Sequence, residues 1–455
     1  MKTQTPGTAA GTNATQLKRV LGTPSLTMFG LVYMVPLTVF TTYGLVTVST
    51  GGRVAAAYIV TLVAMLFTAR SYARMAGAYP LAGSAYVYTQ RTFGPETGFL
   101  VGWALMLDYL FLPMVNYLVI GIYLNVAIPA IPAAVWVLVC IALVTVLNIV
   151  GITSVNRTNL VLIAAQAIFV VVFIVFTIAA MNGQAIDIMA PFRGDGSEAA
   201  GSSGALLGGA AILCLSFLGF DAVSTLAEEA KDAERTVPKA IMIVTLAAGV
   251  IFVLLSWLAQ VAHKSTEFAD PDSAATEVMT AVGGTFLATL FTACYVAGAL
   301  GSALTSQASV ARILYSMGRD GVLPKPIFGR LNERFKSPAT ATLVVSAVSL
   351  LALVVDLAFI ISVVSFGALI AFTFVNLSVI KHFYFDRQER ATAWQHVNNG
   401  LLPLIGVALT VWLWTSLTPT TFAAGGLWVL LGAVVLAIVT KGFRQRAPML
   451  DLKES

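Results

Sequence analysis

The chain has 455 residues, of which 58% are hydrophobic and 10% charged, with a formal net charge of +5. Soluble domains carry about 25% charged residues, so this composition excludes an ordinary water-soluble protein. The apolar residues also come in blocks of about 20, the length of a helix that crosses a bilayer, which predicts an all-α membrane protein. The three cysteines all lie in apolar blocks, so no extracellular disulfide framework is expected.

Twelve transmembrane helices are predicted in chain order. They are placed at about 24–48, 54–76, 93–127, 133–152, 157–182, 205–230, 237–262, 280–316, 338–355, 358–382, 400–418 and 424–443. The polar segment before the first helix lacks a signal-peptide layout, so the N-terminus is expected in the cytoplasm. All but three of the 26 basic residues then lie on the cytoplasmic side, the exceptions being Arg53, Arg193 and Lys264. Both termini are therefore predicted to be cytoplasmic, and the positive charge indicates no nucleic-acid partner.

The first and sixth predicted spans carry interruptions. The run GLVYMVPLT places Pro36 in the middle of the first span, and the run CLSFLGFD places Gly219 and Asp221 at the same depth in the sixth. Proline removes a backbone donor, and unwound backbone is tolerated in a membrane only where protein or a cavity receives it. Paired breaks five helices apart indicate an inverted-repeat transporter with a midplane site. The alternative is an ordinary proline kink together with a packing glycine.

Two acids lie inside predicted spans. Asp108 is in the third span and Asp221 is at the break of the sixth, with no Lys or Arg at comparable depth. Such acids usually face a cavity or a partner, so each is a candidate for binding a substrate amine or carrying a coupling proton. The alternative is a protonated acid that is hydrogen-bonded to unwound backbone. Tyr33, Tyr109 and Phe217 lie near these positions, and aromatic faces suit ammonium groups.

Glu228 lies about two turns after Asp221, at the start of a stretch of mixed charge. A solvated loop is one interpretation, and an inner gate of breakable ion pairs, with Glu228 as a third candidate for proton coupling, is the other. The sequence has no phosphate-binding glycine–lysine motif and no paired-histidine zinc helix. No nucleophile–base set can be assembled near the midplane. We therefore expect no enzyme activity, no metal and no cofactor, and no filter-like loop indicates a channel.

Five runs carry a resemblance to a known family. They are SFLGFDAVSTLAEEAKDAER at 216–235, YSMGRDGVLP at 315–324, GSAY at 83–86, LDYLFLPM at 107–114 and FGALIAFTFVNLS at 366–378. The first two resemble the amino acid–polyamine–organocation superfamily, and the other three resemble its bacterial putrescine importers. The resemblance implies the LeuT-type fold of two inverted five-helix repeats plus two peripheral helices, in a bacterial inner membrane.

The implied organisation divides the chain into six parts. They are a tail at 1–19, the first repeat at 20–182, an external loop at 183–204, the second repeat at 205–382, two peripheral helices at 383–443 and a tail at 444–455. The sequence sets no oligomeric state.

The resemblance also suggests a substrate. Amino acid transporters of the superfamily usually carry a Gly-x-Gly turn in the first helix for the substrate carboxylate, whereas this chain has Pro36-Leu37-Thr38. A site without that turn suits an amine without a carboxylate, although Thr41 replaces an acid of the putrescine importers. We expect importation of a small cationic amine, putrescine or a related polyamine. Its site would be lined by Tyr33, Met34, Pro36, Thr38, Asp108, Tyr109, Phe217 and Asp221.

Coupling to the proton gradient is favoured on the same resemblance. Proton-coupled members often have a lysine in the fifth helix, where this chain has Gln166, so one of the buried acids would have to carry the proton. Sodium coupling would instead use ligands near Ser302 and Thr305. The rival functions are an amino acid importer of the same superfamily and a membrane sensor that keeps the transporter fold.

Overall fold

The computed structural model describes residues 19–81, 83–150, 155–182, 186–319, 323–332, 334–335, 337–442 and 444. Over these ranges every regular element is a helix, and strand pairing is limited to one isolated parallel bridge between Leu21 and Ala230. The predicted all-α fold is therefore confirmed. The predicted tails at 1–19 and 444–455 fall almost wholly outside the described residues.

The described chain up to residue 182 forms one broken helix, one short helix and four long ones. Its elements are α1 (Thr23–Met34), the 3-10 helix η1 (Pro36–Phe40), α2 (Tyr43–Thr50), α3 (Val54–Ala78), α4 (Ser84–Phe93), α5 (Pro95–Ala127), α6 (Ala133–Val150) and α7 (Val155–Met181). The separate helix α4 was not predicted. It ends at Gly94, whose φ of +105° suits glycine, and Pro95 then begins α5.

The remaining described chain follows a similar plan with more interruptions. Its elements are α8 (Ala190–Arg193), α9 (Glu198–Gly201), α10 (Ser203–Phe217), η2 (Ala222–Glu229), α11 (Ala233–Ala262), η3 (Pro271–Ser273), α12 (Ala274–Arg319), α13 (Lys325–Phe328), α14 (Ala339–Ser349), η4 (Leu350–Leu353), α15 (Leu357–Val379), η5 (Ile380–Asp386), α16 (Ala393–His396), η6 (Val397–Leu401), α17 (Leu402–Thr415) and α18 (Pro419–Val439). Here η5 and η6 are π-helical, whereas η2, η3 and η4 are 3-10 helices.

Eleven helical segments of the described chain are long and apolar enough to cross a membrane. The protein is therefore a multi-pass membrane protein. The predicted span at 338–355 coincides with a shorter apolar helix, Ala339–Leu353, so the number twelve stays a prediction. The predicted eighth span began at 280, whereas α12 begins at Ala274 and bends at Gly283 and Gly284, which have non-helical backbone angles.

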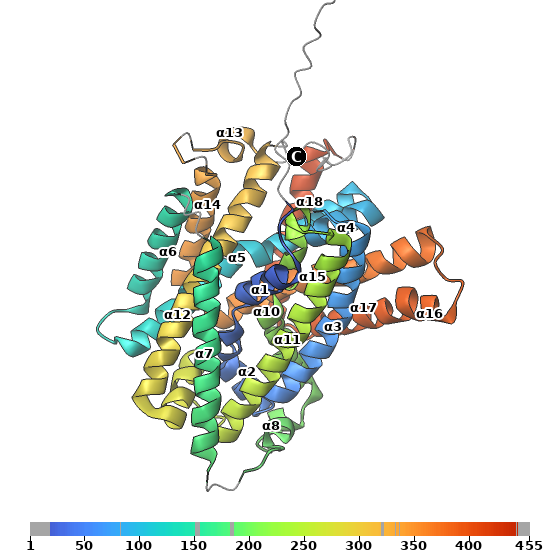
Figure 1. Cartoon of the computed structure of the whole chain (residues 1–455). Coiled ribbons are helices and arrows are strands. Elements are labelled where there is room, and N and C mark those ends of the chain that lie inside the picture. The colour runs from blue at the N-terminus through green and yellow to red at the C-terminus, as the bar shows by residue number, and fades with distance from the viewer. Residues whose placement is uncertain are drawn as a thin grey trace, which may run out of the picture.

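The broken helices lie at the centre of the molecule. In the most apolar stretch of the segment Ser203–Glu229, which contains α10 and η2, 83% of the residues are buried, against 28% for α6 and 17% for α18. Around this centre α3 packs along α11, and α5 packs against both α12 and α15. Figure 1 shows α1 and α10 enclosed by these longer helices, while the hairpin formed by α15 and α17 extends to one side. The fold thus places both interruptions away from lipid.

Candidate functional site

The first span breaks where it was predicted to break. α1 ends at Met34, Val35 takes a φ of +50°, and Pro36 starts the short helix η1. Proline has no N–H to donate and disfavours helical angles in the residue before it, which explains the ending. The Thr38 hydroxyl donates a hydrogen bond of 2.7 Å to the Met34 carbonyl. One of the carbonyls that the break releases is therefore satisfied locally.

The sixth span breaks at the same depth in the fold. α10 ends at Phe217, and Gly219 takes a φ of +127°, which favours glycine. A Cβ atom at Gly219 would lie 2.7 Å from Cδ1 of Tyr33 and 2.8 Å from Cγ of Met34. The two breaks are therefore in direct contact, although they are far apart in the sequence.

Both predicted acids are buried beside this contact, each with 1% of its surface exposed. Asp221 accepts a hydrogen bond of 3.2 Å from the Gly219 amide and one of 3.4 Å from the Tyr109 hydroxyl. Asp108 Oδ1 is buried with no hydrogen-bond partner in the described part of the chain. The two acids lie near one another, since Tyr109, which donates to Asp221, directly follows Asp108 on α5. Since a buried anion without a partner is costly, the pair is suited to receive a cation or a proton.

Aromatic rings from five helices and from the sixth-span break surround the acids. The Tyr72 ring of α3 makes edge contacts with Tyr88 of α4, Phe220 at the sixth-span break and Phe372 of α15, with centroids 6.0, 5.4 and 5.8 Å apart. Tyr33 lies against Gly219, and the Tyr72 ring contacts Phe220, the residue before Asp221. The hydroxyls of Tyr33, Tyr72 and Tyr88 are buried, and none has a hydrogen-bond partner within the described residues. We call Tyr33, Tyr72, Tyr88, Tyr109, Phe220 and Phe372 the aromatic cluster.

Sequence reasoning missed the roles of Tyr72, Tyr88 and Phe372. They lie on unbroken helices with no acid or break beside them, so no local signal distinguishes them from packing residues. Only the crossing of α3, α4 and α15 brings them to the acids.

The other predicted lining residues lie at varying positions around the breaks. Met34 contacts Gly219, and Pro36 and Thr38 are half-buried in η1. The Phe217 ring packs edge-on against Phe252 of α11, with centroids 5.4 Å apart. That ring therefore faces α11, and its predicted part in binding stays a prediction.

Glu228 lies half-buried in η2, near a short pairing of backbone segments. The amides of Val20 and Leu21 donate to the Glu229 carbonyl at 2.9 and 3.0 Å, and the Lys231 amide donates to Leu21 at 2.8 Å. The segment that precedes α1 is thus tied to the end of η2. These backbone hydrogen bonds join the two segments that lie beside Glu228, the residue predicted to belong to an inner gate.

The residues considered for ion coupling occupy helix interfaces. The Ser302 hydroxyl accepts a hydrogen bond of 3.1 Å from the Asn116 side chain, and Thr305 donates 2.9 Å to Gly301 within α12. Gln166 is buried against Gly298, and its Oε1 has no partner in the described residues. Thr41 shares a hydrogen bond with the Tyr295 hydroxyl. In the described ranges, no three or more His, Cys, Asp or Glu side chains are grouped as a metal site.

The comparisons with known proteins identify the family. A family model described as amino acid permease matches residues 26–450. The chain belongs to the amino acid permease family. The permease is 38% identical to the low-affinity putrescine importer PlaP of Escherichia coli strain K12, over 97% of this chain and 98% of that protein. It is 27% identical to the branched-chain amino acid permease BcaP of Bacillus subtilis, over 95% of each, and 24% identical to a methylthioribose transporter of the same organism, over 95% of this chain and 96% of that one. The predicted superfamily is confirmed, and the LeuT-type fold fits this family.

Proposed function

We propose that this permease imports a small cationic amine, putrescine or a related polyamine, and that the proton gradient drives the import by alternating access. The observation that carries the proposal is the pair of buried acids at the contact of the two helix breaks, one with an unpartnered oxygen. None of the ion pairs among the described residues includes Asp108 or Asp221. A ligand that brings positive charge and N–H donors would satisfy both.

The aromatic cluster supports a cation as well. Ammonium groups are attracted to the faces of tyrosine and phenylalanine rings by about 2 kcal/mol when they are desolvated. The unpartnered hydroxyls of Tyr33, Tyr72 and Tyr88 add hydrogen-bond acceptors in the same place. An uncharged apolar solute would leave these groups unsatisfied, so such a solute fits the site poorly.

The proposed orientation places both termini in the cytoplasm of a bacterium, and the permease in its inner membrane. It rests on the distribution of Lys and Arg along the chain. The end of η2 and the segment before α1 then face the cytoplasm, where Glu228 would belong to the inner gate.

The direct test is uptake of radiolabelled putrescine into proteoliposomes, with and without an inward proton gradient. Uptake that the gradient stimulates, and that spermidine but not neutral amino acids suppress, is the expected result. An amino acid importer is the second candidate, because one relative is named a branched-chain amino acid permease. Suppression by zwitterionic amino acids, with no uptake of diamines by folded protein, would favour that candidate and refute ours.

Coupling is tested separately with Asp108→Asn. If Asp108 carries the proton, the variant should lose stimulation by the gradient while it still exchanges labelled for unlabelled substrate across the membrane. Ser302→Ala is the matched comparison, because it alters a hydroxyl near the alternative sodium position. Uptake that depends on a sodium gradient and is lost in Ser302→Ala would exclude proton coupling.

A further inference from the structure

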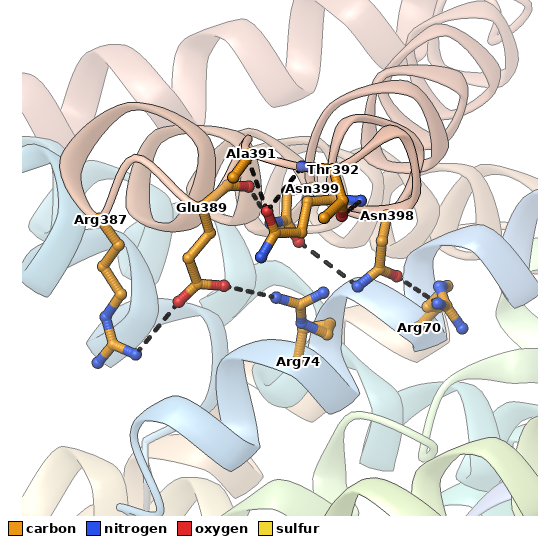
Figure 2. Close-up of polar contacts among 9 residues, drawn as sticks. Arg70, Arg74, Arg387, Glu389, Ala391, Thr392, Asn398 and Asn399 are labelled. Atoms are coloured by element: carbon orange, nitrogen blue, oxygen red, sulfur yellow. Dashed lines mark hydrogen bonds and ion pairs between the residues drawn. The ribbon is translucent and has the colours of Figure 1, made fainter.

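A basic cluster lies where α3, α4 and the connector between α15 and α17 end on one side of the fold. We define it by Arg70 and Arg74 of α3, Arg91 of α4, and Lys381, Arg387 and Arg390 of this connector, which is formed by residues 380–401. Figure 2 shows Arg70 and Arg74 of α3 directed toward Asn398 and Glu389, with Arg387 on the other side of Glu389. The acids that these residues contact are Asp386 and Glu389. The six basic residues of the cluster and the two acids, Asp386 and Glu389, together carry an excess of four positive charges.

The connector is held in a defined shape by its own hydrogen bonds. Gln395 accepts from the amides of Ala391 and Thr392 at 2.8 and 3.2 Å, and its own amide donates 3.2 Å to the Thr392 hydroxyl. Asn399 donates 2.7 Å to the Glu389 carbonyl. The arginines therefore meet a preorganised surface rather than a loose loop.

The acceptors on the connector satisfy only some of the N–H donors of these arginines. Glu389 is shared between Arg74 and Arg387, at 3.8 Å from each. Arg70 donates to the Asn398 side-chain oxygen, but its Nε is buried with no partner in the described chain. Arg74 lies over the Phe383 ring, with its guanidinium carbon 4.0 Å from the centroid. Two guanidinium groups that share one carboxylate at 3.8 Å keep N–H donors for a further anion, such as a phosphate group.

Apolar side chains border the same cluster. Phe385 at the end of η5 and Trp394 in α16 are 59% and 65% exposed. Aromatic rings beside Lys and Arg at the ends of membrane spans are typical of the membrane interface. The surface thus combines a headgroup-level excess of positive charge with rings that can enter the edge of the bilayer.

We propose that the basic cluster binds the phosphate of an anionic phospholipid, of the phosphatidylglycerol class, in the leaflet that covers this end of the helices. The phosphate contacts Arg74 and Arg387, the two guanidinium groups that share Glu389, and the acyl chains lie beside Phe385 and Trp394. A bound lipid at this place joins α3, which belongs to the central helices, to the connector of the outer hairpin. The site is separate from the acids and the aromatic cluster, so it does not depend on the proposed substrate.

The experiment measures thermal unfolding of the purified permease with added phosphatidylglycerol or phosphatidylcholine. We expect phosphatidylglycerol to raise the midpoint by about 5 °C more than phosphatidylcholine does. The double variant Arg74→Gln with Arg387→Gln should lose most of that difference, because it removes both guanidinium groups that share Glu389. Equal effects of the two lipids on the wild type, or an unchanged difference in the double variant, would overturn the proposal.

A control removes the same two charges elsewhere. Arg193→Gln with Arg235→Gln alters arginines that are 68% and 87% exposed and lie outside the cluster, and it should keep the full lipid difference. Glycerol 1-phosphate at the same concentration should not change the unfolding midpoint. A change equal to that caused by the lipid would show that the cluster binds a soluble phosphate rather than a lipid. If the double variant does not fold, Arg387→Gln is measured alone. A smaller difference between the two lipids than in the wild type would support the lipid site, and an unchanged difference would refute it.

Discussion

The polar groups at the broken centre and those at the start of the outermost helix, α18, differ in whether they have hydrogen-bond partners. At the centre, Asp108 Oδ1 and the hydroxyls of Tyr33 and Tyr72 are buried without partners in the described chain. At the edge, α18 starts with Thr418, whose hydroxyl accepts from the Thr421 amide at 3.3 Å. A lipid-facing helix must satisfy its polar groups internally, because the bilayer offers no replacement. At the helix breaks this unused hydrogen-bonding capacity lies beside two buried acids, where a substrate can supply the missing partners.

Helix α5 connects the two regions. Toward the edge, the indole N–H groups of Trp103 and Trp428 each donate to the other residue's carbonyl, at 2.9 and 2.8 Å, and their rings stack with centroids 5.2 Å apart. Toward the centre, the same helix presents Asp108 and Tyr109. One face of α5 therefore packs against α18, whereas the other face contributes the candidate binding residues Asp108 and Tyr109.

The largest effect is expected from Asp221→Asn, at the centre. The amide can still accept from Gly219 but cannot balance an ammonium charge, and losing one partner of a buried charge pair costs about 3 kcal/mol, or about a hundredfold in putrescine uptake. Uptake into proteoliposomes with equal reconstituted protein measures it. Asp187→Asn, which alters an exposed acid paired with Arg193, should transport normally. Wild-type uptake by Asp221→Asn would remove this acid from the mechanism.

Gly219→Ala tests the contact between the breaks. Alanine at a φ of +127° is strained by about 1–2 kcal/mol, and its Cβ would displace Tyr33 and Met34, which adds about 1–3 kcal/mol. We expect reduced uptake and a lower unfolding midpoint. Gly208→Ala in α10, whose Cβ would meet only the Ser416 carbonyl at 3.8 Å, should be tolerated. Equal behaviour of the two variants would show that the break needs no glycine.

Trp428→Phe tests the contact between α18 and α5 at the edge of the molecule. It removes one hydrogen bond to Trp103, a contribution of about 0.6 kcal/mol in membrane proteins, so the unfolding midpoint should fall by about 1 °C with uptake unchanged. Trp412→Phe, on an indole that is 52% exposed, should leave the midpoint unchanged. A large loss of uptake in Trp428→Phe would mean that the edge takes part in transport.

The smallest effect is expected in the loop before α9, where hydrogen bonds from Ser197 and Thr266 hold the pKa of Asp195 below its ordinary value. A lowered pKa stabilises the folded state at pH values above the ordinary pKa of about 4, and this contribution is lost as the pH falls through the lower folded value. Asp195→Asn should therefore lower the unfolding midpoint slightly at pH 7. The difference should vanish at strongly acidic pH, and a difference independent of pH would contradict this assignment.

The sequence was most informative where a local rule applies. Pro36 and Gly219 have backbone requirements that act within a few residues, so both breaks were found at the right positions. Asp108 and Asp221 stood out because a charge in an apolar run is rare. By contrast, α4 was missed because its residues 84–93 are too polar to read as a span. Tyr72, Tyr88 and Phe372 of the aromatic cluster were missed because their rings come from separate helices.

By itself, then, the sequence determined the membrane class, the helical fold, the two breaks and the two acids, because each depends on hydropathy or on local backbone chemistry. Only the tertiary structure decided which groups meet. It set Gly219 against Tyr33, left Asp108 Oδ1 without a partner among the described residues, and turned the Phe217 ring toward α11. The packing of α3, α4, α5 and α15 brings these groups together, and such packing depends on shape across helices that no single stretch of sequence contains.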